Sequence, residues 1–385
     1  MKILWWTPAS PLAPTGYGRV TNNMARQLEK MGHEVHILVA GGQRHGNFTV
    51  DGLRIYSNPV GAMNVEYAVR LFKKLQADVC IYHGDFWPYA SSMEDAGGEM
   101  PLILHSPIDH WPVTEMELKV IRKAKMLITL SRCGVQWVKD GGCENVAYGP
   151  HGCDLSIYHP DNFLDARKTL GWPDDKFIYL TVATNKGDRK NHAGMLRAYK
   201  SLLKRRPDAR DLTLLVIHTY PFRDEVNEEG YDLMNIAISL GLQANVLFPD
   251  PLTYLEGISD AQMAMMYQAA DVHVLPSKTE GFGLPLIEAG ACSLASITTR
   301  FASMPELVGN DGWLIDVVDM EVQQLLGYAW QSIPSTAHLS TLLEYVYDHP
   351  DELRECGRRM RRKVETGFTW EKAASYWGPI LEKAL

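Results

Sequence analysis

The sequence predicts an α/β protein built from two doubly wound lobes, and three observations support this fold class. The chain has 385 residues, which is enough for two domains of ordinary size. Over roughly the first 150 residues, short β-rich apolar segments alternate with longer segments of helical period, a pattern typical of parallel sheets covered by helices. The same alternation starts again at Lys176, so a second lobe with the same plan is expected.

The first lobe is predicted from strands that are separated by helical segments. After the first strand, apolar residues recur at helical spacing between Val20 and Met31, and this helix is expected to end at Gly32. The pair Asp51-Gly52 lies between two short β-rich segments and predicts a hairpin, because its turn requires positive φ. Strands are expected at residues 2–7, 34–40, 78–83, 101–105 and 126–130.

The second lobe follows a stretch from Tyr148 to Pro160 that is rich in glycine and proline and lacks periodicity. We place the hinge in this stretch, which predicts an N-terminal domain at residues 1–160 and a C-terminal domain at residues 161–369. A last helix is expected at residues 370–385. Within the second lobe, strands are expected at 176–183, 212–218, 245–249 and 271–275, and helices from about 191, at 227–240 and at 258–270.

The composition excludes several classes of protein. Subtracting 46 acidic from 38 basic residues gives a net charge of −8, so the chain lacks the overall positive charge that would favour nucleic acid. The six cysteines are scattered and form no C-x-x-C pair, which favours reduced thiols over a zinc site. The apolar run before Pro8 is too short for a secretory segment, and no run reaches the ~20 apolar residues of a membrane span. A cytoplasmic protein is therefore expected.

Basic residues crowd one predicted helix between Arg354 and Lys363. Such a run is typical of a solvated helix face. Weak peripheral contact with anionic lipid, or with a phosphorylated acceptor, is the alternative. The sequence does not assign an oligomeric state.

The loops after the strands are where a ligand is expected, because open α/β sheets bind ligands outside the carboxyl ends of their strands. The first such loop ends in Gly16, Tyr17 and Gly18 before a predicted helix. Its two glycines favour close approach of the backbone to an anion, and an ordinary connecting loop is the alternative. Thr21 stands where the fingerprint G-x-G-x-x-G requires its third glycine, which argues against a nicotinamide oxidoreductase.

The loop after the strand that ends at Leu275 carries the clearest pattern. Glu280 opens this loop and Glu288 follows eight residues later, inside a helix whose first turn is favoured by Pro285. Carboxylates placed in this way accept hydrogen bonds from a polyhydroxylated ligand, while backbone N–H groups face its anionic part. Two surface glutamates on an ordinary loop are the alternative. The backbone between the carboxylates includes Gly281, Phe282, Gly283 and Leu284.

This segment resembles a known family. Residues 270–277, followed by 280–289, are similar to the E-x(7)-E signature of the large retaining glycosyltransferase family 4, which has the GT-B fold. Three further segments resemble motifs of that family in the same order, at residues 32–35, 150–154 and 368–370. The resemblance implies two Rossmann-like lobes with an interdomain cleft, a donor site in the C-terminal lobe, an acceptor site in the N-terminal lobe, and a last helix that packs back on the first lobe.

The resemblance also implies roles for individual residues of the second lobe. Glu288 would bind the ribose hydroxyls of a nucleotide diphosphate sugar, and Glu280, with the backbone of residues 281–284, would bind the transferred hexose. Lys190, with Arg189 beside it, would neutralise the diphosphate. Asn185 stands where the family usually has an arginine, which is a departure from its pattern.

In the first lobe, His105 at the end of a predicted strand resembles the histidine that reaches the donor sugar in this family. Without the resemblance, a structural histidine is the simpler interpretation. Asp109 is a second candidate, because it could orient either the acceptor or the histidine. Aromatic residues near the predicted strand ends, Trp111 among them, either form a platform for a sugar or belong to the core.

The absence of other motifs narrows the reaction. The chain has no D-x-D, so charge neutralisation is expected from side chains and helix dipoles rather than from a metal ion. It also lacks the G-x-S-x-G, H-E-x-x-H and P-loop motifs of hydrolases, metalloproteases and NTPases. The resemblance to family 4 then implies a hexosyltransferase that uses no cofactor and transfers the sugar, with retention, to a sugar, a lipid-linked or a protein hydroxyl acceptor. A nucleotide-sugar epimerase, a phosphorylase and a non-catalytic binding module are the alternatives.

Overall fold

The computed structural model describes residues 1–40, 46–58, 63–161, 163–323 and 328–384. The chain divides into two compact units. The first comprises Met1–Gly152 together with Thr369–Leu385, and the second comprises Cys153–Phe368. The boundary expected after residue 160 therefore falls inside the second unit, which already includes most of the Gly/Pro-rich stretch.

The described part of the first unit contains one eight-stranded sheet with the order β3-β4-β2-β1-β5-β6-β7-β8. Neighbouring strands are parallel except for β3 and β4, which form the predicted hairpin with Asp51 and Gly52 at φ 48° and 85°. The strands are β1 (Lys2–Thr7), β2 (Glu34–Val39), β3 (Asn47–Val50), β4 (Leu53–Ser57), β5 (Val79–His83), β6 (Leu102–His105), β7 (Met126–Thr129) and β8 (Val146–Tyr148).

The helices of the first unit bury apolar faces against this sheet. Val20, Met24 and Leu28 lie on the buried face of α1 (Gly16–Lys30), as their spacing predicts. Trp6, Leu38 and Leu104 belong to the core. The other helices before residue 152 are η1 (Trp87–Tyr89), α2 (Val65–Leu75), α3 (Ala90–Glu99), α4 (Glu115–Lys123) and α5 (Arg132–Asp140).

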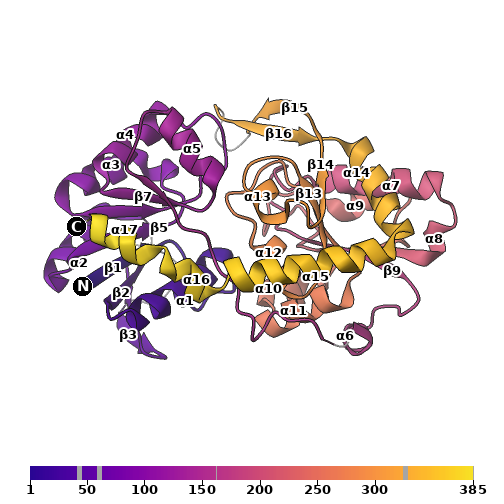
Figure 1. Ribbon diagram of the computed structural model, residues 1–385, viewed down its shortest axis with the longest axis horizontal. Helices are drawn as coiled ribbons and strands as arrows, with labels where there is room; N and C mark the ends of the chain where they lie inside the picture. Colours follow the sequence, from indigo (N-terminus) through magenta and orange to yellow (C-terminus); the bar gives the residue numbers. More distant parts are fainter. Residues whose placement is uncertain (41–45, 59–62, 162, 324–327, 385) are drawn as a thin grey trace. The chain divides into compact units, whose positions relative to one another are not determined.

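The C-terminal segment belongs to the first unit but is not the single helix expected at 370–385. It forms α16 (Trp370–Ser375) and α17 (Trp377–Ala384) instead. The helix is interrupted because Pro379 has no N–H to donate to the carbonyl of Ser375. Figure 1 draws α16 in yellow beside the indigo α1, and Gln27 of α1 donates a hydrogen bond to Glu371 of α16 at 3.1 Å.

The described part of the second unit contains a six-stranded parallel sheet with the order β11-β10-β9-β12-β13-β14. From β9 the chain moves outward through β10 to β11, and then returns to β12 on the other side of β9. The strand order therefore reverses between β9 and β12, which is where open α/β sheets place a ligand crevice. The strands are β9 (Phe177–Val182), β10 (Thr213–His218), β11 (Val246–Leu247), β12 (Val272–Leu275), β13 (Ser296–Thr299) and β14 (Trp313–Ile315).

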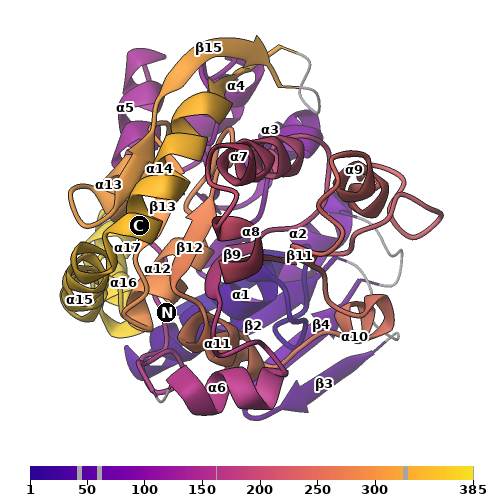
Figure 2. The ribbon, with the colours of Figure 1, turned by 90° about the vertical axis from the view of Figure 1, so that its right-hand side faces the viewer.

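Helices cover this second sheet, and Figure 2 shows α7 and α14 side by side. The helix expected at 227–240 is shorter, because Asp232 caps α9 at its N-terminus and accepts a hydrogen bond from the Asn235 N–H. The helices are α6 (Phe163–Leu170), α7 (His192–Arg205), α8 (Ala209–Leu212), α9 (Leu233–Ser239), α10 (Pro251–Glu256), α11 (Asp260–Ala269), α12 (Leu284–Ala291), α13 (Met304–Val308), α14 (Thr336–Asp348) and α15 (Pro350–Gly367).

A separate antiparallel pair, β15 (Val317–Val322) and β16 (Trp330–Pro334), follows the six-stranded sheet. Figure 1 shows the two strands side by side in orange. The periodicity of the sequence did not predict this pair. All six cysteines are free thiols, as expected. Among the helices of the described residues, none is both long enough and apolar enough to cross a bilayer.

Candidate functional site

Two loops of the second unit meet at the carboxyl ends of β9 and β12. These strands are neighbours in the sheet, with Val272 opposite Tyr179. The Lys278 N–H donates to the carbonyl of Arg189 at 2.8 Å, and the Asn191 side chain donates to the carbonyl of Pro276 at 3.2 Å. The loop at 183–191 and the loop at 276–283 are therefore joined by one main-chain hydrogen bond and by one from the Asn191 side chain.

Glu280 lies at the centre of these loops and brings three of the predicted residues together. Its Oε1 accepts hydrogen bonds from Lys190 Nζ at 2.5 Å and from Ser277 Oγ at 2.6 Å, and its Oε2 contacts Arg189 Nη1 at 3.3 Å. Burial alone would raise the pKa of this carboxyl, which is only 6% exposed, but Lys190 and Arg189 outweigh burial and hold the pKa below its usual range. Glu280 is therefore ionised at neutral pH.

The backbone that follows Glu280 is held in a fixed shape. Gly283 has φ 103° immediately before α12, a conformation that favours glycine. Ser303 Oγ, just before α13, contacts the carbonyl oxygens of Glu280 and Phe282 at 2.8 and 2.7 Å, which anchors the loop. Leu284 begins α12, and Gly281 is buried between the two anchored carbonyls. The predicted binding backbone therefore leads directly into a helix N-terminus, as the sequence indicates.

Glu288 lies further along α12 and is buried, with 5% of its surface exposed. The hydroxyl of Tyr267, on α11, donates a hydrogen bond to its Oε2 at 3.0 Å. Glu288 is therefore oriented by α11, whereas Glu280 is oriented by Arg189 and Lys190 of the loop at 183–191. A pocket shared by Glu280, Glu288 and Lys190 stays a prediction.

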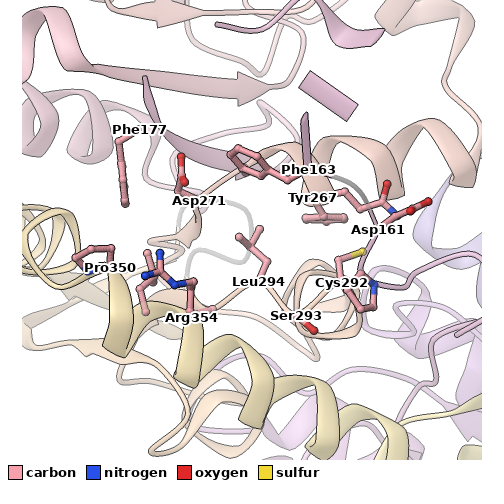
Figure 3. Close-up of a pocket in the computed structure, with 15 residues that line it drawn as sticks. Asp161, Phe163, Phe177, Tyr267, Asp271, Cys292, Ser293, Leu294, Pro350 and Arg354 are labelled. Atoms are coloured by element: carbon pink, nitrogen blue, oxygen red, sulfur yellow. The ribbon is translucent and has the colours of Figure 1, made fainter. Parts of the chain in front are cut away.

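A cavity of about 410 Å³ opens at the opposite, amino-terminal edge of the second sheet. Figure 3 shows the rings of Phe163, Phe177 and Tyr267 along one side and Arg354 of α15 across from them. Asp271, which precedes β12, also lines it. The predicted loops lie at the other ends of these strands, so the size of this cavity does not identify the site. Tyr267 nevertheless connects the cavity wall to Glu288.

Asn185, at the position of the family's usual arginine, has a structural role. Its Nδ2 donates to the carbonyl oxygens of Tyr220 and Tyr231 at 3.0 and 2.7 Å, and its Oδ1 accepts from the Tyr231 N–H at 3.0 Å. The side chain is buried and pins the loop before α9. Positive charge at this site comes instead from Arg189 beside Lys190.

The glycine pair of the first unit lies at the N-terminus of α1. Thr15 caps the helix, and its Oγ1 accepts a hydrogen bond from the Gly18 N–H at 3.1 Å. A Cβ at Gly18 would lie 2.3 Å from the carbonyl oxygen of Ala13, which explains why the position is a glycine. The N–H of Gly18 is therefore already hydrogen-bonded to the cap, and Gly16 is the first residue of the helix. That this loop faces an anion stays a prediction.

Tyr17 lies among acidic groups and histidines of the first unit. Its ring packs edge-on against His83 at 5.2 Å. Burial raises the pKa of the Tyr17 phenol, and the negative charges of Asp85 and Asp109 raise it further. The phenol therefore stays protonated, and its hydrogen-bond partner within this unit is Asp85.

His105 ends β6 and is almost fully buried. Its ring stacks on His83 at 4.6 Å and meets the edge of Trp377 at 4.8 Å. Neither ring nitrogen has a hydrogen-bond partner among the described residues. Burial, followed by the neighbouring His83 and His151, lowers the pKa of His105 well below its usual range, so the ring is neutral and can act as a hydrogen-bonding group but not as a charged one.

Asp109 contacts a neighbouring histidine that the sequence did not single out. His110 Nδ1 lies 3.2 Å from Asp109, and His110 Nε2 lies 3.1 Å from the buried Glu117. Burial opposes protonation of His110, but hydrogen bonds to these two carboxylates outweigh it and raise the pKa to about 10. Asp109 therefore forms an ion pair with His110, whereas its expected role toward acceptor or His105 stays a prediction.

The basic helix is α15, and acidic neighbours pair with its arginines. Arg358 Nη2 lies 2.7 Å from Glu355, and Arg361 Nε lies 2.6 Å from Glu365. Arg359 contacts Asp311 at 3.0 Å. These ion pairs are formed within the second unit, and contact with lipid stays a prediction.

The structure adds residues that sequence reasoning missed. Ser277 and Ser303 orient Glu280 and its loop, and Tyr267 orients Glu288. Ser277 could have been found from its place three residues before Glu280, but Tyr267 and Ser303 come from other elements and carry no motif. Over the described ranges, no group of three or more His, Cys, Asp or Glu side chains is arranged to hold a metal ion. Metal independence stays a prediction.

The sequence model of the family described as "Glycosyl transferases group 1" matches residues 162–325. A D-inositol 3-phosphate glycosyltransferase of Arthrobacter sp. (strain FB24) is 26% identical over 234 residues, which are 60% of this chain and 48% of that protein. An MMP alpha-(1->4)-mannosyltransferase of Mycolicibacterium hassiacum is 35% identical over 130 residues, which are 34% of this chain and 28% of that protein. The chain thus spans about half, or less, of the length of these curated relatives.

Solved structures resemble the chain over its whole length. Sucrose-phosphate synthase from Thermosynechococcus elongatus has a TM-score of 0.80 at 17% identity, covering 99% of this chain and 98% of that one. Anabaena Alr3699/HepE in complex with UDP and glucose has a TM-score of 0.73 at 15% identity, covering 99% of both chains. These likenesses show the fold. Together with the family match, they confirm the resemblance to the GT-B glycosyltransferases.

Proposed function

We propose that this chain, a GT-B glycosyltransferase whose residues 162–325 match the group 1 family, transfers a hexose from a nucleotide diphosphate sugar to a hydroxyl acceptor. The anomeric configuration is retained and no metal ion or other cofactor takes part. The acceptor is a sugar, a lipid-linked or a protein hydroxyl, and the reaction takes place in the cytoplasm.

The cluster around Glu280 is the observation that carries this proposal. Arg189 and Lys190 converge on a single carboxylate at the edge of the sheet where the strand order reverses. Cleavage of the sugar–phosphate bond builds negative charge on the departing diphosphate, and in this proposal these two cations stabilise it. A loop of paired carboxylates alone would repel the diphosphate.

The two glutamates have different tasks in this proposal. Glu280 is ionised and accepts hydrogen bonds from hydroxyls of the hexose, as the depressed pKa of its carboxyl favours. Glu288, oriented by Tyr267, accepts hydrogen bonds from the ribose hydroxyls. The backbone of residues 281–284, which leads into the N-terminus of α12, faces the anionic part of the donor.

The first unit supplies the acceptor contacts in this proposal. Tyr17, with Gly16 and Gly18 beside it, and Asp109 bind or orient the acceptor, and the neutral His105 offers its ring nitrogens to the donor sugar. The acceptor oxygen bonds to the anomeric carbon on the face that the diphosphate leaves. The departing phosphate oxygen takes the acceptor's proton, so no carboxylate nucleophile is needed.

The relatives support the class of reaction. The curated ones are named as glycosyltransferases and a mannosyltransferase, and one solved neighbour holds UDP and glucose. They do not select the base, the sugar or the acceptor of this chain. A screen of UDP-, GDP- and ADP-sugars for protection against thermal unfolding addresses the donor. A donor at 100 times its Kd stabilises the folded chain by about 2.7 kcal/mol.

Two variants test the assigned roles. Glu288→Ala should weaken nucleotide binding, with Glu256→Ala, an exposed glutamate of the same unit, as its control. Lys190→Ala should lower turnover more than donor affinity, because it stabilises charge that develops as the bond breaks. Lys186→Ala is the matched control, since Lys186 is in the same loop but pairs at the surface with Glu229. Wild-type values in both site variants would overturn these assignments.

The products separate transfer from the other reactions. Nucleotide release that requires an added acceptor supports transfer over epimerisation, and indifference to inorganic phosphate argues against a phosphorylase. Donor binding without turnover on any acceptor class would instead identify a binding module.

A further inference from the structure

Lys278 is a nearly buried lysine, two residues before Glu280, that the proposed chemistry does not use. Its side chain is 11% exposed, and its Nζ contacts Asp188 Oδ2 at 2.5 Å and the carboxylate of Glu321. Burial lowers the pKa of this ammonium, but the two carboxylates outweigh burial and raise it, so Lys278 is charged. One cation thus bridges two acidic side chains from different segments.

The second of these segments is the antiparallel pair β15–β16. Glu321 of β15 lies opposite Gln331 of β16, so their side chains share one face of the pair. Gln331 Nε2 donates to Glu321 Oε1 at 3.1 Å and to Asp188 Oδ1 at 3.4 Å. Gln331 is buried, so the same acidic pair that Lys278 bridges is also held by an amide.

Main-chain bonds link Lys278 to both sides. Its N–H donates to the carbonyl of Arg189, and its carbonyl accepts hydrogen bonds from the N–H and the hydroxyl of Ser332 in β16. Arg189 in turn contacts Glu280. A continuous set of contacts therefore runs from the antiparallel pair, through Lys278, to the cations beside Glu280.

The charges of this region balance only when Lys278 is counted. Asp188, Glu280 and Glu321 carry three negative charges, whereas Arg189, Lys190 and Lys278 carry three positive charges. With Lys278 removed, Asp188 and Glu321 face each other without a cation. Each of them is then free to draw Arg189 or Lys190 away from Glu280.

We infer that Lys278 is a positioning residue, which ties the antiparallel pair β15–β16 to the loops at 183–191 and 276–283 and thereby keeps Arg189 and Lys190 beside Glu280. This inference rests on the proposed function, because it assigns the tied cations to a diphosphate. In this inference the pair β15–β16, which lies outside the parallel sheet, stabilises the loops at 183–191 and 276–283.

Calorimetric titration with UDP, GDP and ADP tests the inference on the full chain. Lys278→Met should weaken the affinity for the nucleotide that wild type binds by about tenfold, because a displaced cation no longer faces the diphosphate. Lys278→Arg keeps the charge and the reach, and should restore affinity to within about twofold. Lys186→Met, in the same loop but paired at the surface, should leave affinity unchanged.

A double variant separates position from charge. Lys278→Met combined with Glu321→Gln restores the charge balance, with two negative and two positive charges. It does not restore the contacts of Lys278 with Asp188 and Glu321. Affinity that stays weakened supports positioning, whereas recovery to the wild-type value would overturn it and leave only a charge effect. If Lys278→Met does not fold, Glu321→Gln alone keeps the Lys278–Asp188 pair and should weaken affinity by about threefold.

Two outcomes distinguish this inference from the proposed function. Normal nucleotide affinity in a folded Lys278→Met, or in Glu321→Gln where Lys278→Met does not fold, would overturn the inference and leave the proposed function intact. A wild-type chain that binds neither UDP, GDP nor ADP would overturn the proposed function, and the inference with it. Melting temperatures of the variants, measured in parallel, show whether a loss of affinity is accompanied by a loss of folding.

Discussion

Raising the pH above 6.5 should destabilise the first unit through His110. The imidazolium is buried between Asp109 and Glu117, and these carboxylates raise its pKa to about 10 against an ordinary value of 6.5. Because the folded pKa lies above the unfolded one, this stabilisation is fully present below pH 6.5. It is lost progressively as the pH rises toward 10.

The size of the effect follows from these two values. Well between these two values each pH unit removes about 1.4 kcal/mol, and the stabilisation falls by roughly 2 kcal/mol between pH 6.5 and 8.5. The whole interval corresponds to about 5 kcal/mol. This is comparable to the total stability of many domains, which is about 5–15 kcal/mol.

Urea unfolding between about pH 6.5 and 9.5, followed by tryptophan fluorescence, measures this loss, because Trp5 and Trp6 are buried in the same unit. The control is the double variant His110→Gln/Glu117→Gln, which removes the titrating ring together with its most buried partner. Glutamine still suits the capping box that Glu117 forms with Thr114. Wild type should lose stability with pH more steeply than the double variant. Parallel pH profiles for the two proteins would refute the assignment of a buried imidazolium.

Two further predictions concern the second unit. Asn185→Ala should lower the free energy of unfolding by about 3 kcal/mol, because it leaves buried main-chain groups of the loop before α9 without partners; a change below 1 kcal/mol in urea unfolding would contradict this. Tyr267→Phe should weaken nucleotide affinity about fivefold while hardly changing the melting temperature, because it removes only the hydroxyl that orients Glu288. Calorimetric titration checks this second prediction, and unchanged affinity would argue against Glu288 as a ribose ligand.

The sequence predicted most strands of the parallel sheets, because these strands are short apolar runs, but it did not predict β8, β13 and β14. The strand predicted at 2–7 is β1, and the one at 271–275 differs from β12 by a single residue. Errors occurred where a tertiary contact or a single residue overrides the pattern. Pro379 interrupts the last helix. The helix expected from residue 227 begins only at Leu233, because the residues before it form a loop that Asn185 holds by hydrogen bonds.

The candidate site could be predicted in part for the same reason. Glu280, Gly283 and Lys190 follow strands that are adjacent in the sheet, so topology alone brings their loops together. Asp109 was assigned a role without its partner His110, because nothing in the local pattern distinguishes a buried histidine from a solvated one. The depth at which His105 is buried, under Trp377 from the far end of the chain, also depends on contacts between distant segments.

Lys278 shows what a count of charges leaves out. From the sequence, Arg189 and Lys190 are two cations available to a diphosphate, and Lys278 is one more charge in a loop. In the structure, the balance depends on Glu321, which is brought in by the register of a strand pair that the periodicity does not reveal. The pairing of Asp188, Glu280 and Glu321 therefore decides which cations remain for a ligand. Part of that pairing depends on β15–β16, which lies outside the E-x(7)-E segment.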